Sequence, residues 1–197
     1  MKKETKDTKN RIIDSTLDLI DKKPFPEVRT KEIAKKAGIS EVTVFRYFDS
    51  KSSIFNTLID RFIDFINPAD FSNITKEEEF REELIRSLRL VCSVNYFKRK
   101  MLKCFLYVGM YREDTFFQFV NISNSQIFGP VEECVEYGKK YWGYGKKINT
   151  KIQVRLFINS IFLFIIQQKV FMGEKIEKYD FDEIIITSVD NFLKSLK

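Results

Sequence analysis

Residues 30–48 read TKEIAKKAGISEVTVFRYF, a run of apolar residues at helical spacing that Gly38 interrupts and that resumes at once. Glycine adopts the left-handed backbone conformation without steric cost, so Gly38 predicts a tight turn between two short helices rather than one helix with a poor residue. Thr30 stands where it can cap the first helix, and Ser40 where it can cap the second. The segment therefore predicts a helix-turn-helix.

The side chains around this turn divide into an inward and an outward set. Ala34 is small enough to let the second helix cross closely over the first. The residues expected to face the core are Ile33, Ala34, Ala37, Ile39, Val44 and Phe48. The residues expected to stay exposed on the second helix are Glu41, Val42, Thr43, Phe45, Arg46 and Tyr47. Because a recognition helix places its N-terminal residues against base edges, this set favours DNA binding over an ordinary helical hairpin.

The net charge of +6 is distributed unevenly along the chain. Residues 1–51 contain 13 Lys and Arg against 9 Asp and Glu, a net of +4, whereas the remaining residues contain 21 against 19, a net of +2. A basic excess beside a helix-turn-helix suits an anionic partner such as DNA. A solvated, lysine-rich terminus explains the same excess equally well.

The chain as a whole predicts an all-α fold. Of its 197 residues only seven are Gly and four Pro, and no alternating strand pattern stands out. We place a helix-turn-helix domain at 1–51, a connecting helix at 51–66 and a larger helical domain at 67–197, after the stretch NPADFSN. Further helices are expected at 76–95, at 98–111, at 114–142 with a possible break at Gly129-Pro130, at 150–171 and at 181–196.

Composition argues against an enzyme, a metal site and a cofactor. The chain has no histidine, which is the commonest general base and the commonest transition-metal ligand. Its three cysteines are widely spaced and include no C-x-x-C pair, so we expect buried thiols rather than a disulfide framework, a zinc site or a redox switch. Carboxylates such as Glu132 and Glu133 lie in charged runs, where solvation is enough to explain them.

Neither apolar nor basic segments predict a membrane protein. The N-terminal MKKETKDTKN lacks the apolar core of a signal peptide. The most hydrophobic stretch, LFINSIFLFII at 156–166, is shorter than the roughly 20 residues that cross a bilayer. We therefore expect a buried helix in a cytoplasmic protein with no membrane contact.

Residues Thr30 to Ile54 follow the pattern T-x-x-I-A-x-x-A-G-I-S-x-x-T-V-F-x-Y-F-x-S-K-x-x-I. This pattern resembles the N-terminal signature of the TetR family of bacterial transcriptional regulators, and it covers about a quarter of the chain. The resemblance implies three N-terminal helices that bind DNA and a helical domain that dimerises and encloses a ligand cavity. It implies a ligand-responsive regulator, a repressor in the first instance, that binds a palindromic operator as a homodimer and is released by a small-molecule effector.

The resemblance also implies roles for individual residues. Thr30, Thr43, Tyr47 and Lys51 match positions that contact phosphates, and Glu41, Val42 and Arg46 fall where sequence readout is expected. The full DNA-binding set is Arg29, Thr30, Ser40, Glu41, Val42, Thr43, Phe45, Arg46, Tyr47 and Lys51. Two positions depart from the family, which usually has tyrosine in place of Phe45 and often glycine in place of Val42. A valine there either contacts a thymine methyl group or excludes close backbone approach.

The apolar surplus of the last two helices predicts a dimer interface, since pairing two copies in a four-helix arrangement would bury it. The candidate residues are Leu156, Phe157, Phe164, Ile185 and Phe192. The alternative is that these helices form the core of a monomer.

Aromatic residues of the central helices predict a pocket for a small apolar or aromatic effector, although such a stripe is also typical of packed core. The candidate pocket residues are Phe97, Cys104, Tyr107, Met110, Tyr111, Phe119 and Asn121. The competing function is a helical binding module that uses its basic N-terminus for protein or membrane contacts.

Overall fold

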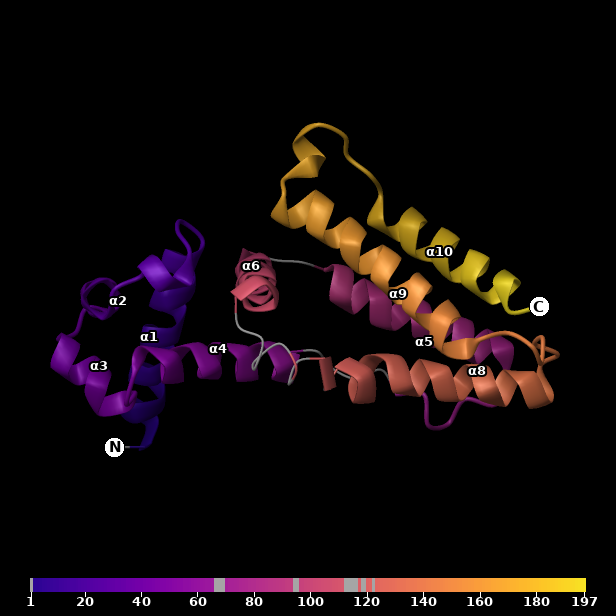
Figure 1. Cartoon of the computed structure of the whole chain (residues 1–197), viewed down its shortest axis with the longest axis horizontal. Helices are drawn as coiled ribbons and strands as arrows, with labels where there is room; N and C mark the ends of the chain where they lie inside the picture. The colour runs from indigo at the N-terminus through magenta and orange to yellow at the C-terminus, as the bar shows by residue number, and fades with distance from the viewer. Residues whose placement is uncertain (1, 66–69, 94–95, 112–116, 118–119, 122) are drawn as a thin grey trace. The chain divides into compact units, whose positions relative to one another are not determined.

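The computed structural model describes residues 2–65, 70–93, 96–111, 117, 120–121 and 123–197 (Figure 1). Over these residues every regular element is helical, which confirms the predicted all-α class. The α-helices are α1 (Lys2–Ile20), α2 (Thr30–Ala37), α3 (Glu41–Tyr47), α4 (Lys51–Phe65), α5 (Glu77–Cys92), α6 (Tyr96–Tyr111), α8 (Gly129–Tyr141), α9 (Thr150–Ile165) and α10 (Phe181–Ser195). Short 3₁₀ or π turns are η1 (Phe25–Glu27), η2 (Asn124–Phe128), η3 (Ile166–Val170) and η4 (Gly173–Lys175).

The expected break at Gly129-Pro130 is a change of helix type instead of an interruption. The π turn η2 leads directly into α8, and the residues on either side of the junction, Phe128 and Gly129, both have right-handed helical backbone angles. Pro130 stands in the first turn of α8, directly after this junction.

The chain divides into two compact units. Unit 1 contains α1 to α4 together with α6, and unit 2 contains α5, α8, α9 and α10. The predicted division at residue 67 differs from this arrangement in one element, since α6 follows the division in sequence yet packs against α1 and α4. Local periodicity identifies a helix but carries no information about which distant helix it will contact.

Unit 1 is built around apolar side chains that α1, α2, α3 and α4 turn inward. The rings of Phe25 and Phe55 lie 4.5 Å apart between their centroids, and both are buried. Fully burying a side chain of this size stabilises the fold by about 2 kcal/mol. Besides Phe55, the fully buried apolar residues of these four helices are Ile12, Ile13, Leu17, Ile33, Val44, Ile54 and Leu58.

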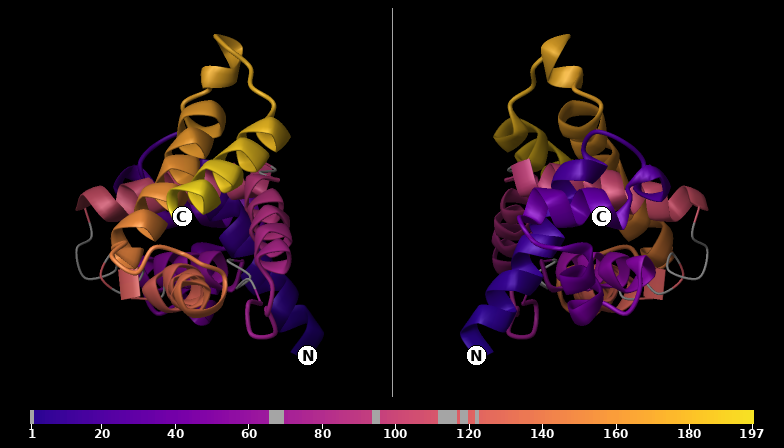
Figure 2. Two further views of the ribbon diagram at one scale, coloured as in Figure 1. Left: turned by 90° about the vertical axis from the view of Figure 1, so that its right-hand side faces the viewer. Right: turned by 90° about the vertical axis from the view of Figure 1, so that its left-hand side faces the viewer.

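Unit 2 holds α10 against both α5 and α9 (Figures 1 and 2). The rings of Phe157 and Phe192 stack at 4.2 Å between centroids and join α9 to α10. Arg89 of α5 pairs with Asp182 at the start of α10, with 2.6 Å from Nε to Oδ1. A stacked ring pair in the core and an ion pair on the surface thus position the last helix.

Helix α9 is buried on one face only, which corrects the expectation of a buried helix at 156–166. It contacts α8 and α10, and Ile152, Leu156 and Leu163 remain 54%, 64% and 58% exposed. By length and composition alone Thr150–Val170 is apolar enough to cross a membrane, a test that core helices of soluble proteins also pass, and 33% of its most apolar window is buried inside the chain. Unit 2 therefore leaves an apolar face of α9 uncovered.

Candidate nucleic-acid interface

The turn between α2 and α3 is made at Gly38, which has φ 66° and ψ 37°. The N–H of Ile39 donates to the carbonyl of Ala34 at 3.0 Å and so closes the C-terminal end of α2. A Cβ at Gly38 would lie 3.2 Å from Nη2 of Arg11, which itself donates to the carbonyl of Ala37. Gly38 thus has the left-handed conformation that its place in the sequence predicts, and Arg11 of α1 fastens the turn to the rest of unit 1.

The two helix starts are capped differently. Ser40 caps α3 as predicted, since its Oγ accepts the N–H of Thr43 at 3.1 Å. Thr30 does not cap α2, because it is the first helical residue and Arg29 precedes it as the cap residue. The Arg29 N–H instead donates to the Glu32 carboxylate at 2.8 Å. This corrects the predicted role of Thr30, whose hydroxyl donates to the carboxylate of Glu41 and joins the starts of α2 and α3.

Helix α3 is anchored by one face and presents the other. Val44 and Phe48 are buried, whereas Val42 is 80% exposed and Phe45 is 47% exposed. Arg46 is exposed too, and its guanidinium carbon lies 5.3 Å from the centroid of the Tyr47 ring. The six residues predicted to stay on the outer side of this helix are exposed or half-buried.

Lys51 opens α4, but its ammonium group turns back onto unit 1. Nζ donates to the carbonyl of Pro26 at 2.8 Å and lies 4.6 Å from the centroid of the Phe25 ring. Partial burial, and next the nearby charge of Lys23, lower the pKa of Lys51 below its ordinary value, against the opposing effect of Glu32. An ammonium group has three hydrogens, so this bond still leaves donors for a phosphate.

The acidic side chains beside the turn are matched by donors. The ammonium of Lys23 lies 2.7 Å from Glu32, and this hydrogen bond together with that of the Arg29 N–H holds the pKa of the Glu32 carboxyl below its usual range. Glu41 accepts from Thr30. Arg29, Lys31, Lys35 and Arg46 are exposed. The cations of this surface are therefore exposed to an anionic partner, while hydrogen bonds hold the carboxylates of Glu32 and Glu41 in place.

Of the predicted pocket residues, the structure describes the side chains of Cys104, Tyr107, Met110 and Asn121. Cys104 is buried, and desolvation raises the pKa of its thiol to about 12. Tyr107 packs its ring edge against Phe55 of α4, 6.2 Å away, while Met110 and Asn121 are exposed. The side chains of Phe97, Tyr111 and Phe119 lie outside the described residues.

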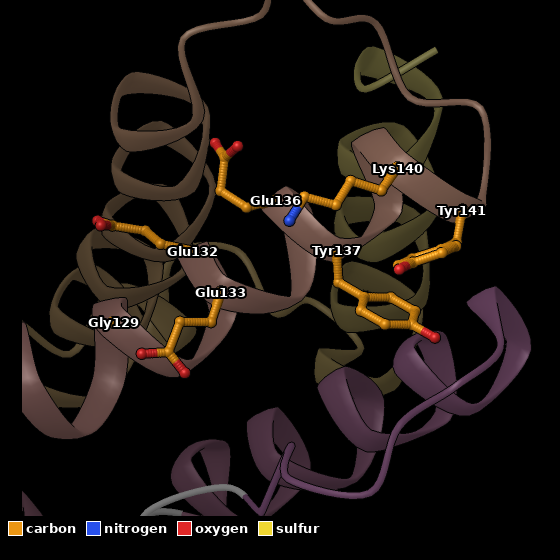
Figure 3. A pocket seen from close by; sticks show the side chains of 7 residues that line it. All are labelled: Gly129, Glu132, Glu133, Glu136, Tyr137, Lys140 and Tyr141. Atoms are coloured by element: carbon orange, nitrogen blue, oxygen red, sulfur yellow. The ribbon is translucent and has the colours of Figure 1, made fainter.

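A groove of about 530 Å³ runs along α8. Its lining residues are Gly129, Glu132, Glu133, Glu136, Tyr137, Lys140 and Tyr141. Figure 3 shows the carboxylates spread along the helix and the two tyrosine rings beside one another, with centroids 4.4 Å apart. Glu132 and Glu136 already pair with Arg155 and Lys139. This open, acidic surface differs in place and in chemistry from the predicted apolar pocket.

A second, smaller groove of about 280 Å³ lies between α9 and α10. It contains three of the residues predicted for a dimer interface, Leu156, Phe157 and Phe192. Leu156 is exposed, whereas Phe157, Phe192 and Ile185 are buried inside unit 2, and Phe164 is half-buried. The accessible apolar surface of α9 is formed instead by Leu156 with Ile152 and Leu163, two residues that sequence periodicity did not single out.

Residues 12–58 match the family model described as bacterial regulatory proteins, tetR family. An uncharacterized HTH-type transcriptional regulator of Bacillus subtilis strain 168, YvkB, is 41% identical over 54 residues, which are 27% of this chain and 29% of that protein. The alignments to the curated relatives span less than half the length of each relative. The match to the family model spans the turn at Gly38 and the helices on either side of it.

Solved structures resemble the chain over nearly its whole length. FadR of Bacillus subtilis in complex with stearoyl-CoA has a TM-score of 0.64 at 16% identity, over 95% of this chain and 98% of that one. The SmeT–triclosan complex has a TM-score of 0.71 at 15% identity, over 96% and 92% of the two chains. At such identities the likeness concerns the fold, and the fold shared here is an all-α one.

Proposed function

Because the chain belongs to the tetR family of bacterial regulatory proteins, we propose that it represses transcription by binding a palindromic operator as a homodimer. The observation that carries this proposal is the helix-turn-helix of α2 and α3, in which Gly38 has the left-handed conformation. Within α3 itself, Val44 is the buried residue that anchors the helix to the core. This arrangement leaves the opposite side of α3 free to enter a major groove. Its place of action would be the cytoplasm, where the bacterial chromosome lies.

Phosphate contacts would come from the residues that surround α3. Arg29 is an exposed cation, and Lys51 retains ammonium hydrogens beyond the one that it gives to Pro26. Two more contacts would come from the hydroxyl groups of Thr43 and Tyr47 on α3. Both side chains are half-buried. Such contacts fix the position and the register of a protein on DNA without reading its sequence.

Dimerisation would use the uncovered face of α9. Ile152, Leu156 and Leu163 recur along this helix and are more than half exposed, and Leu156 also lines the groove between α9 and α10. A second copy related by a two-fold axis would remove this apolar surface from water. The same axis would supply the second recognition helix that a palindromic operator requires.

An apolar or aromatic small molecule would release the operator. The structural relatives FadR and SmeT were solved with stearoyl-CoA and with triclosan, respectively, and both ligands carry large apolar parts. Binding of an effector in the helical region after α4 would change the separation of the two recognition helices. Half-sites are fixed about 34–36 Å apart by the DNA helix, so a small change in that separation weakens both contacts together.

The test is binding of the purified chain to a labelled duplex from the region upstream of its own gene, followed by fluorescence anisotropy. We expect binding at low salt and a steep linear fall of log K with log salt concentration, because each phosphate contact releases counterions. A scrambled duplex of equal length is the control for specificity. Absence of binding to the upstream duplex at 50 mM salt would overturn the proposed function.

A further inference from the structure

Two exposed apolar side chains form a ridge on α3. Val42 and Phe45 are one helical turn apart, so they project on the same side, and they are 80% and 47% exposed. Their neighbours Val44 and Phe48 are buried, which shows that the core has room for apolar side chains from this segment but does not take these two. Exposure of the ridge follows from the way α3 is anchored.

The polar side chains next to the ridge have partners within unit 1. The Glu41 carboxylate accepts the hydroxyl of Thr30, and Thr43 Oγ1 lies 2.8 Å from Ser40 Oγ. The Arg46 guanidinium lies over the ring of Tyr47. Val42 and Phe45 therefore point outward from α3, while Glu41 and Thr43 beside them already make hydrogen bonds within unit 1.

We propose that the ridge of Val42 and Phe45 reads thymine through its 5-methyl group, so that each operator half-site carries thymine where α3 begins. This inference rests on the proposed function, namely on α3 lying in the major groove. Among the four bases only thymine presents a methyl group in that groove, and apolar side chains recognise it by contact. The exposed cations of the same helix-turn-helix segment, Arg29, Lys31, Lys35 and Arg46, match DNA better than an apolar protein partner.

The experiment begins by selecting duplexes from a random-sequence library with the full chain. Each thymine of the selected half-site is then replaced in turn by deoxyuridine, which differs from thymidine only in lacking the methyl group. Affinities are measured for the wild-type chain, for Val42→Ala and for Val91→Ala, the same change at an exposed valine of α5. Thermal melting followed by circular dichroism checks that the variants are folded.

At one or two thymines we expect deoxyuridine to weaken wild-type binding about fourfold per half-site, the loss that corresponds to one methyl group no longer buried. Val91→Ala should respond like the wild type, and Val42→Ala should lose sensitivity to that substitution. This inference would be overturned if deoxyuridine left the affinity unchanged at every position, or if it weakened binding of Val42→Ala as much as binding of the wild type. Either result would leave the proposed function intact. Failure to select any duplex would overturn the proposed function and this inference with it.

Discussion

Lys100 of α6 donates to the carboxylate of Asp18 on α1, and the Lys100 side chain is only 3% exposed. The other oxygen of the same carboxylate lies 2.9 Å from the ammonium of Lys36 on α2. One aspartate therefore joins α6 to the helix that precedes the turn at Gly38. Because α6 arrives from a distant part of the sequence, this link ties the helix-turn-helix to a segment outside the family signature.

Asp18→Asn should destabilise the chain by about 2 kcal/mol, because it removes the carboxylate that faces a buried ammonium group. This figure is below the usual cost of breaking a buried pair, since the Asp18 side chain is 40% exposed. Urea unfolding at pH 7 gives the measurement. The matched control is Asp14→Asn. The Asp14 side chain pairs with Arg61 and is 63% exposed, so its substitution should cost less than about 1 kcal/mol. If both variants lost the same free energy of unfolding, the Lys100 contact would not have the stabilising role assigned to it.

Stability should fall on acidification below about pH 4. Burial raises the pKa of Asp18 and of Asp21. Hydrogen bonds from Lys100 and Lys36 to Asp18 and from Lys103 to Asp21, together with the charges of neighbouring cations, outweigh burial and hold both pKa values below the ordinary one. A carboxyl whose folded pKa is depressed contributes stability above its unfolded pKa, and that contribution is lost as the pH falls through the folded value. Urea midpoints measured from pH 6 to pH 3 should decline less steeply for Asp18→Asn than for the wild type. Parallel curves would speak against this assignment.

Gly38→Ala should cost about 1–2 kcal/mol, since an L-residue with a Cβ is strained at φ 66°. The new Cβ would also lie 3.2 Å from the Arg11 guanidinium, which would have to shift. Gly38→Asn is the informative comparison, because asparagine tolerates the left-handed conformation and should therefore lose clearly less stability than alanine. Chemical unfolding of both variants measures the difference, and an alanine variant as stable as the wild type would refute the argument.

Leu156→Glu should dissociate the proposed dimer, because it places a charge on the exposed face of α9 that a second copy would cover. Sedimentation velocity over a range of protein concentrations distinguishes dimer from monomer. Val91→Glu, at a 46% exposed position of α5, serves as the control and should remain dimeric. A dimer that survives Leu156→Glu unchanged would place the interface elsewhere.

Arg46→Ala should weaken binding to the upstream duplex and reduce the slope of log K against log salt by about one for each subunit. The reason is that Arg46 is an exposed cation on α3 and no ion pair within the described residues neutralises it. Lys140→Ala removes an exposed cation from α8 and should leave both quantities unchanged. The comparison separates a local contact of Arg46 with DNA from a general loss of positive charge.

Much of the fold was predictable because its signals are local. Apolar spacing identified the helices, and it placed Ile33 and Val44 in the core. Backbone preference identified the turn at Gly38, and the short reach of a serine side chain identified the cap at Ser40. Each of these inferences concerns residues within a few positions of one another, where the chain has few conformations to choose from.

Tertiary structure decided the contacts between distant residues. The sequence by itself determined that α6 would be a helix, but only packing placed it in unit 1, through Lys100 and Asp18. Packing likewise gave the Thr30 hydroxyl a hydrogen bond to Glu41, where the sequence predicted that Thr30 would cap α2. It also left Leu156 exposed on a helix that is apolar nearly all round. Helical periodicity specifies which residues share a face. Which face is covered depends on the free energy of contacts with helices that lie far away in the chain.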